Sequence, residues 1–196
     1  MTKTEFLVHH GVKGQKWGVR RYQNEDGSRT ELGKKHQRTL FVSGSSKTQF
    51  KDSGYYRRTL PKEVRQVLQK CMDEKVDIIV GDAPGIDRQV QNFLNRHKYD
   101  QVEIYGPGKQ VRYSANKRWK TNPIDDPDHE PMSPEWLAKK DIAMERAATE
   151  GLAVVLDEGA KATRNNVARL EANGKPVSVY ELSKNGRRKD RWVKRG

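Results

Sequence analysis

Glycine and small polar residues follow four apolar runs of the sequence, and these are the residues whose types and spacing could do chemistry. The four segments are 43–46, 81–87, 106–108 and 157–163. Glycine lets backbone N–H groups approach an anion, and a helix N-terminus adds partial positive charge. The segments therefore favour a phosphate or a phosphorylated sugar, unless their glycines only turn the chain. Neither G-x-G-x-x-G nor a Walker A motif is present, which argues against a standard dinucleotide or P-loop site.

Charged residues beside these segments have two interpretations each. Asp82 and Asp87 flank the second segment, and Asp87 falls in the first turn of an expected helix. There it either caps the helix or accepts hydrogen bonds from ribose hydroxyls. Lys140 and Asp141 lie inside another expected helix, where they form either a solvated face or part of a site.

Short apolar runs alternate with helical periodicity, and the order predicts the fold. Strands are expected at residues 39–43, 77–80, 101–105, 151–156 and 176–180, with helices from Pro61, at 86–97, at 134–149 and at 163–172. This order predicts an α/β, Rossmann-like, doubly wound and mostly parallel five-stranded sheet. The polar stretch 106–133 is long for a connection, and it predicts a functional lid or a mobile segment.

Charge is distributed unevenly along the 196 residues, which carry a formal net charge of +13. Residues 1–38 carry +5 and residues 184–196 carry +6, which leaves +2 for residues 39–183. We therefore expect a near-neutral domain at 39–183 between extended basic tails. A strongly basic folded core is excluded, and this counts against a DNA-binding domain.

The composition excludes other classes. One cysteine, Cys71, permits neither an intrachain disulfide nor a cysteine-based zinc cluster. There is no apolar run of about 18 residues and no long apolar stretch typical of a secretory signal. We expect a soluble protein made in a cytoplasm, with no membrane association.

The central domain resembles the SLOG superfamily of Rossmann-like proteins, in particular its YspA-like and LOG-like groups. The resemblance rests on Val42-Ser43-Gly44-Ser45, on residues 80–87, on Lys140-Asp141-Ile142-Ala143-Met144 and on residues 157–166. It implies a nucleotide- or NAD-derived ligand. The loops and the resemblance together predict a ligand-binding set of Ser43, Gly44, Ser45, Gly81, Asp82, Gly85, Asp87, Lys140, Asp157, Gly159, Thr163 and Asn166, with neither a further cofactor nor a metal.

The sequence departs from the LOG hydrolases at the end of the last loop. Where that group has a second glycine and a catalytic glutamate, this chain has Ala162 and Asn166. An amide cannot act as a carboxylate acid, base or nucleophile. If the domain is an enzyme of N-glycosidic hydrolysis or ribosyl transfer, another acid must serve, and the candidates are Asp87, Asp141 and Glu145.

The N-terminal segment resembles a short motif of tailed-phage head and portal-region proteins. The resemblance covers residues 9–24, and it implies docking on a phage head or portal-region protein through residues 1–38. The expected docking residues are His10, Gly11, Lys13, Gly14, Trp17, Gly18, Arg20, Arg21 and Tyr22. The pair His9 and His10 has no evident third ligand, so a metal site is not expected there.

The basic run at residues 187–195 favours a solvated tail over a nucleic-acid contact, although weak nonspecific DNA contact suits packaged DNA.

The resemblances imply a virion-associated protein, in the phage head and then the host cytoplasm, that binds a nucleotide-derived molecule to sequester or degrade a host defence signal. The alternatives are a ribosyl hydrolase or transferase and a structural head component without a ligand. Self-association is a further implication, because SLOG relatives often form oligomers.

Overall fold

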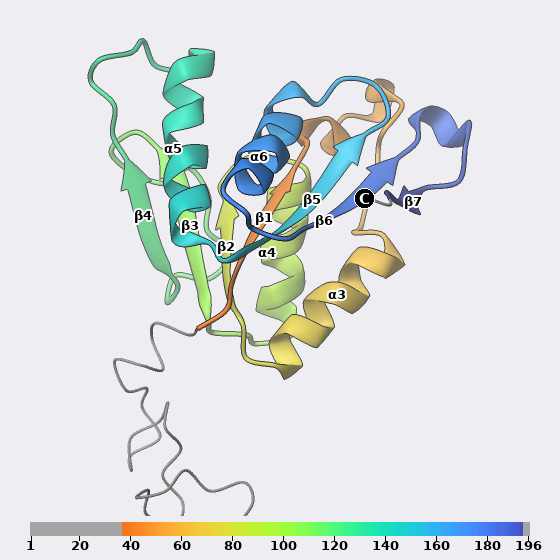
Figure 1. Cartoon of the computed structure of the whole chain (residues 1–196), viewed down its shortest axis with the longest axis horizontal. Coiled ribbons are helices and arrows are strands. Elements are labelled where there is room, and N and C mark those ends of the chain that lie inside the picture. The colour runs from red at the N-terminus through yellow and green to blue at the C-terminus, as the bar shows by residue number, and fades with distance from the viewer. Residues whose placement is uncertain (1–36, 194–196) are drawn as a thin grey trace, which may run out of the picture. The chain divides into compact units, whose positions relative to one another are not determined.

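The computed structural model describes residues 37–193, and residues 38–193 belong to one compact unit. Figure 1 shows a single twisted sheet with helices on both faces. The strands are β1 (Thr39–Gly44), β2 (Asp77–Gly81), β3 (Val102–Pro107), β4 (Lys120–Ile124), β5 (Glu150–Leu156), β6 (Val177–Leu182) and β7 (Arg191–Trp192). The helices are α3 (Lys62–Asp73), α4 (Ile86–Arg96), α5 (Pro134–Ala147) and α6 (Lys161–Ala172), with short 3-10 turns η1 (Ser46–Gln49), η2 (Lys51–Ser53) and η3 (Lys184–Gly186).

The sheet has the order β4-β3-β2-β1-β5-β6-β7, and every neighbouring pair is parallel except β6 and β7. The predicted Rossmann-like α/β class and its five central parallel strands are confirmed. The chain moves outward from β1 to β2 in one direction and later returns to place β5 on the other side of β1. The reversal therefore lies between β1 and β5, which is where such sheets usually bind ligands.

The sheet has two strands more than the five predicted. β4 lies inside the stretch predicted as a loop, and its side chains are mostly exposed, so the apolar signal of a buried strand is missing. Pro123 sits in this edge strand, where a missing N–H costs no ladder bond to a further strand.

β7 lies in the segment predicted as an extended tail, of which residues 184–193 are described. This part is folded onto the domain: β7 pairs antiparallel with β6, and the Trp192 ring meets the Tyr180 ring edge-on at 5.0 Å. Asp190 accepts a hydrogen bond from the Ser183 backbone N–H at 2.8 Å and closes the turn between the strands. The local sequence Arg-Trp-Val is too short to predict a strand by itself.

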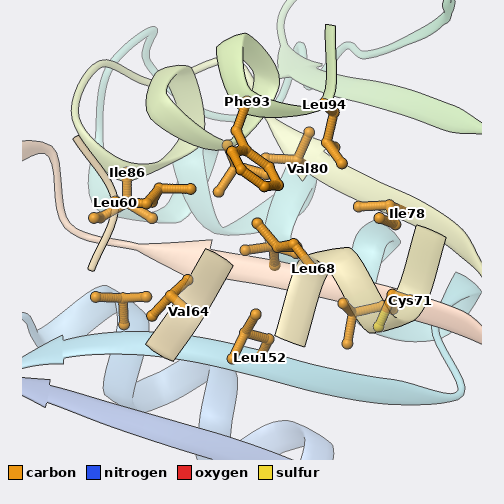
Figure 2. Packing of buried hydrophobic residues seen from close by; sticks show 14 of the residues in the cluster. Leu60, Val64, Leu68, Cys71, Ile78, Val80, Ile86, Phe93, Leu94 and Leu152 are labelled. Atoms are coloured by element: carbon orange, nitrogen blue, oxygen red, sulfur yellow. The ribbon is translucent and has the colours of Figure 1, made fainter. Parts of the chain in front are cut away.

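Alternate residues of the central strands face two different layers. Leu40 and Val42 of β1 pack in a cluster with α3 and α4, whereas Phe41 packs with α5 and α6 residues. Figure 2 shows the first cluster, in which Leu68 of α3 lies among Phe93, Leu94 and the strand residues. In Figure 1, α5 and α6 lie in front of the sheet and α4 lies behind it. No helix in the described part of the chain is long and apolar enough to cross a membrane.

Candidate functional site

Two helices begin without side-chain caps at the carboxyl edge of the sheet. α4 starts after Gly85, which has a φ of 83°, and α6 starts after Gly159 and Ala160, which have φ values of 82° and 58°. Neither first turn receives a side-chain hydrogen bond at its N-cap. At α4 the Ile86 N–H donates to the Ser45 carbonyl at 3.3 Å, so the start of α6 is the more open of the two as a donor site for an anion.

A buried group of charged side chains lies between these helix starts. Lys140 of α5 donates a hydrogen bond from Nζ to Asp141 Oδ1 at 2.5 Å, and both side chains are largely buried. Asp87 of α4 reaches the same place from the other side of the sheet. A Cβ at Gly81 would overlap Asp87 Oδ2 and lie 3.1 Å from Lys140 Nζ. Glycine at the end of β2 therefore leaves room for both side chains to approach one another.

Burial sets the protonation of this group. Desolvation raises the pKa of Asp87 to about 7, because the attraction of Lys140 offsets only part of the cost of burying its charge. Desolvation also acts to lower the pKa of Lys140, but the carboxylates of Asp141 and Asp87 outweigh it, so this pKa is raised. Asp87 can therefore exchange a proton near neutral pH, which is the property of a general acid or base.

Asn166 connects α6 to the same group. Its Nδ2 donates to Ser43 Oγ and to Asp141 Oδ2, both at 3.0 Å, and its Oδ1 accepts from Arg169 Nη1 at 2.6 Å. The amide therefore orients Asp141 and ties β1, α5 and α6 together. Arg169, which sequence reasoning missed, lies one turn after Asn166 on the same helix face, and that spacing was the available signal.

Asp82 is held by a residue of the predicted lid. Arg112 donates three hydrogen bonds to the Asp82 carboxylate, from its backbone N at 2.7 Å, from Nε at 3.1 Å and from Nη2 at 2.5 Å. Gln91 adds a second tie, donating to the Gly81 carbonyl at 2.8 Å and accepting from the Ala115 N–H at 3.0 Å. Residues 112–115 are thus anchored over the ends of β2 and β3. Sequence reasoning found this stretch but neither Arg112 nor Gln91.

The loops after β1 and β5 contain the other predicted residues. Ser45 Oγ accepts from the Lys47 N–H at 3.2 Å and caps η1, and Thr163 is buried in the first turn of α6. A Cβ at Gly159 would lie 3.6 Å from Lys47 Nζ, so that lysine stands close to the start of α6. Gly44 is covered by Ile86.

Two predicted residues have structural partners. Asp157 accepts hydrogen bonds from Tyr55 Oη at 2.6 Å and from the Lys184 N–H, and it thereby joins three loops. Glu145 forms an ion pair with Lys175 at 2.7 Å in the last turn of α5. That turn leads into the amino end of β5. The structure therefore brings Asp87 and Asp141 together and leaves Glu145 apart.

Hollows of about 570, 430, 360 and 520 Å³ open on the surface, and of the predicted binding residues only Gly85 lines any of these four. The charged group is closed over by its own ion pair and by Asn166. A ligand at this edge must therefore rest on the helix starts above the buried group. No cluster of three metal-binding side chains occurs within residues 37–193.

The comparisons with known proteins concern the N-terminal segment. Residues 2–24 match the model of a family of unknown function (DUF7211). The match includes all nine expected docking residues, which lie outside the described residues. No curated protein sequence matches the chain.

Proposed function

We propose that residues 39–183 bind a nucleotide- or NAD-derived small molecule at the carboxyl edge of the sheet, beside the β1–β5 reversal. One observation carries this proposal: two uncapped helix starts, of α4 and α6, flank one buried group of Lys140, Asp141 and Asp87. Free backbone donors suit phosphate oxygens, and buried carboxylates suit sugar hydroxyls. The SLOG-like motifs lead to the same ligand class.

The phosphate end of the ligand would lie at the start of α6. Backbone N–H groups after Ala160 are available there, and the Lys47 ammonium stands near Gly159. The left-handed backbone of Gly159 and Ala160 turns successive N–H groups toward one side, a geometry that suits anions.

The sugar end would lie over Asp87 and Asp141, whose carboxylates would accept hydrogen bonds from ribose hydroxyls once Lys140 and Asn166 move aside. A second candidate function is supported by the pKa of Asp87 near 7. In N-ribosyl hydrolysis, protonated Asp87 gives its proton to the leaving base as the C1′–N bond breaks. Water then supplies the hydroxyl at C1′ and its remaining proton restores Asp87. Asn166 orients Asp141 in this scheme and transfers no proton.

The phage-like N-terminal motif extends the proposal to a biological setting. A protein carried with a phage head and delivered to the host cytoplasm could sequester or degrade a nucleotide used as a defence signal. Trp17→Ala in the full chain tests the docking step: we expect loss of the protein from purified virions. Incorporation at the wild-type level would contradict the docking role and would leave the ligand proposal unaffected.

Thermal unfolding of the full chain with NAD, ADP-ribose, cyclic ADP-ribose variants and nucleoside monophosphates tests ligand binding. A ligand at one hundred times its Kd should stabilise the protein by about 2.7 kcal/mol. Thr163→Val and Asp87→Asn should abolish the shift, while the surface changes Thr121→Val and Asp128→Asn should preserve it.

Chromatography of the same mixtures separates binding from hydrolysis. Release of free base by the wild type, but not by Asp87→Asn, would support the hydrolase. Absence of any ligand shift in the wild type would overturn the proposed function and leave a structural head component. Equal shifts in the wild type and both site variants would show that the site is elsewhere.

A further inference from the structure

Three hollows on the surface of α3 and α4 share their lining residues. The hollow of about 570 Å³ shares Thr59, Leu60 and Arg65 with the one of about 430 Å³. It shares Arg58 and Gln89 with the one of about 520 Å³. They form one continuous depression, which we call the basic trough because its cationic lining residues are Arg57, Arg58, Lys62, Arg65, Arg88, Arg96 and Lys189.

Most of the arginines in the trough have no acidic partner. Arg58, Arg65, Arg88 and Arg96 take part in none of the ion pairs formed within residues 37–193. The acids in the lining, Glu63 and Asp190, already bind Tyr180 and Arg57. The trough therefore has a surplus of guanidinium groups, which suit phosphate oxygens bidentately.

The floor and walls of the trough suit bases as well as phosphates. Leu60 and Phe93 close the floor but are only 3% and 7% exposed, and Gln89, Asn92 and Asn95 provide amides. Gln89 Nε2 donates to the Arg57 carbonyl at 2.7 Å, but its Oε1 is buried and lacks a hydrogen-bond partner. The Arg88 guanidinium lies over the Tyr113 ring, 4.4 Å from its centroid, so one planar stacking contact already exists beside the trough.

We infer that the basic trough binds a single strand of nucleic acid. Arg88, Asn92 and Arg96 recur at every fourth residue of α4, so the two guanidiniums start about 12 Å apart along the helix. That span suits several phosphates of an extended chain better than one mononucleotide. Unstacked bases can lie on the exposed guanidinium planes and hydrogen-bond the amides, whereas the bases of a duplex are hidden. A carboxylate-rich peptide would satisfy the arginines and leave the amides unused.

A near-neutral net charge is compatible with a basic trough. A domain of +2 can carry a basic face if its acids gather elsewhere, and here Asp125, Asp126, Asp128 and Glu130 lie together in the loop before α5. The folded C-terminal segment adds Lys189 to the trough. Lys189 of the basic run and the arginines of α3 and α4 thus line one surface.

Fluorescence anisotropy of a labelled twenty-nucleotide thymidine strand with the full chain, from 50 to 300 mM salt, tests the inference. The variant Arg58→Gln/Arg65→Gln/Arg96→Gln should weaken binding about tenfold or more at 50 mM, and should reduce the slope of log K against log salt by about 2. The matched control Lys109→Gln/Lys120→Gln/Arg146→Gln removes the same charge away from the trough. The control should bind the strand within about twofold of the wild type, because charges far from the bound strand are largely screened by salt.

The outcomes separate the alternatives. Equal affinity of the trough variant and the control would overturn the inference and assign DNA contact to the tails. Equal affinity for duplex and single strand would overturn the single-strand assignment, and tighter binding of poly-glutamate would point to an acidic polypeptide. Matching unfolding temperatures of both variants show that any loss is local, and an unchanged nucleotide-induced shift in the trough variant keeps this surface distinct from the proposed ligand site.

Discussion

The two faces of the sheet are built differently. Against α3 and α4, one continuous apolar cluster runs from the Cys71 end to Leu182. Against α5 and α6, the apolar residues form two smaller clusters, and the buried group of Lys140, Asp141 and Asn166 lies at the carboxyl edge on this side. The first face gives the domain its stability. The second has smaller apolar clusters and a buried charged group, as expected if the proposed ligand site lies there.

The largest expected effect is on the apolar face. Leu68→Ala removes a fully buried side chain at the centre of the α3 cluster (Figure 2). The lost burial and the cavity should reduce the free energy of unfolding by about 4 kcal/mol. Urea denaturation measures the change, and the exposed Gln69→Ala is the control. A loss below about 1 kcal/mol would mean that α3 is not the main cover of this face.

The next effect is on the polar face. Lys140→Met leaves Asp141 and Asp87 buried without their cation, so the free energy of unfolding should fall by about 3 kcal/mol. Lys139→Met is the control, because the neighbouring side chain is half exposed. Adding Asp141→Leu to Lys140→Met should recover part of the loss. If the double variant is instead less stable than the single one, the pair does not act as a unit.

A smaller effect depends on pH. The pKa of Asp87 rises from 3.8 to about 7 on folding, so the native state retains a proton that the unfolded chain releases. This contribution is fully present below about pH 4 and is lost as pH rises to 7. Relative to Asp87→Asn, the wild type should therefore lose about 2 kcal/mol between about pH 5.5 and pH 7, because the loss is about 1.4 kcal/mol per pH unit. Parallel stability curves for the two proteins would contradict the assignment of burial as the cause.

The smallest expected effect concerns the folded C-terminal segment. Trp192→Ala removes the edge-on contact with Tyr180 and should cost about 1 kcal/mol. Amide hydrogen exchange of β6 and β7 should accelerate locally, while α3 and α5 stay protected. If hydrogen exchange in β6 and β7 is unchanged in the variant, the contact of Trp192 with Tyr180 does not hold residues 184–193 on the domain.

Apolar patterning predicts the central fold because each inner strand is a short hydrophobic run, as Ile78-Ile79-Val80 illustrates. Patterning fails for β4 and β7, whose partly exposed residues take their conformation from a neighbouring strand. For such edge strands the conformation depends on pairing with a neighbouring strand, and a short window of sequence does not show that pairing.

The loops of the candidate site could be predicted from the sequence, but the partners of their side chains could not. Glycines after strands indicate the loops, and Asp87 follows from its position beside one of them, whereas Lys140 was a candidate because residues 140–144 resemble a family motif. Arg112 lies 30 residues from Asp82 along the chain, so nothing in the local sequence pairs them. The basic trough was hidden for the converse reason: net charge sums over a domain, whereas binding depends on how charge is arranged on its surface.

The outer strands also determine how copies of the chain could associate. β4 presents exposed polar side chains and Pro123, and β7 is only two residues long. Short, charged or proline-bearing borders discourage edge-to-edge aggregation. Within residues 37–193, the sheet edges therefore favour association through helices or loops over extension of one sheet across two molecules.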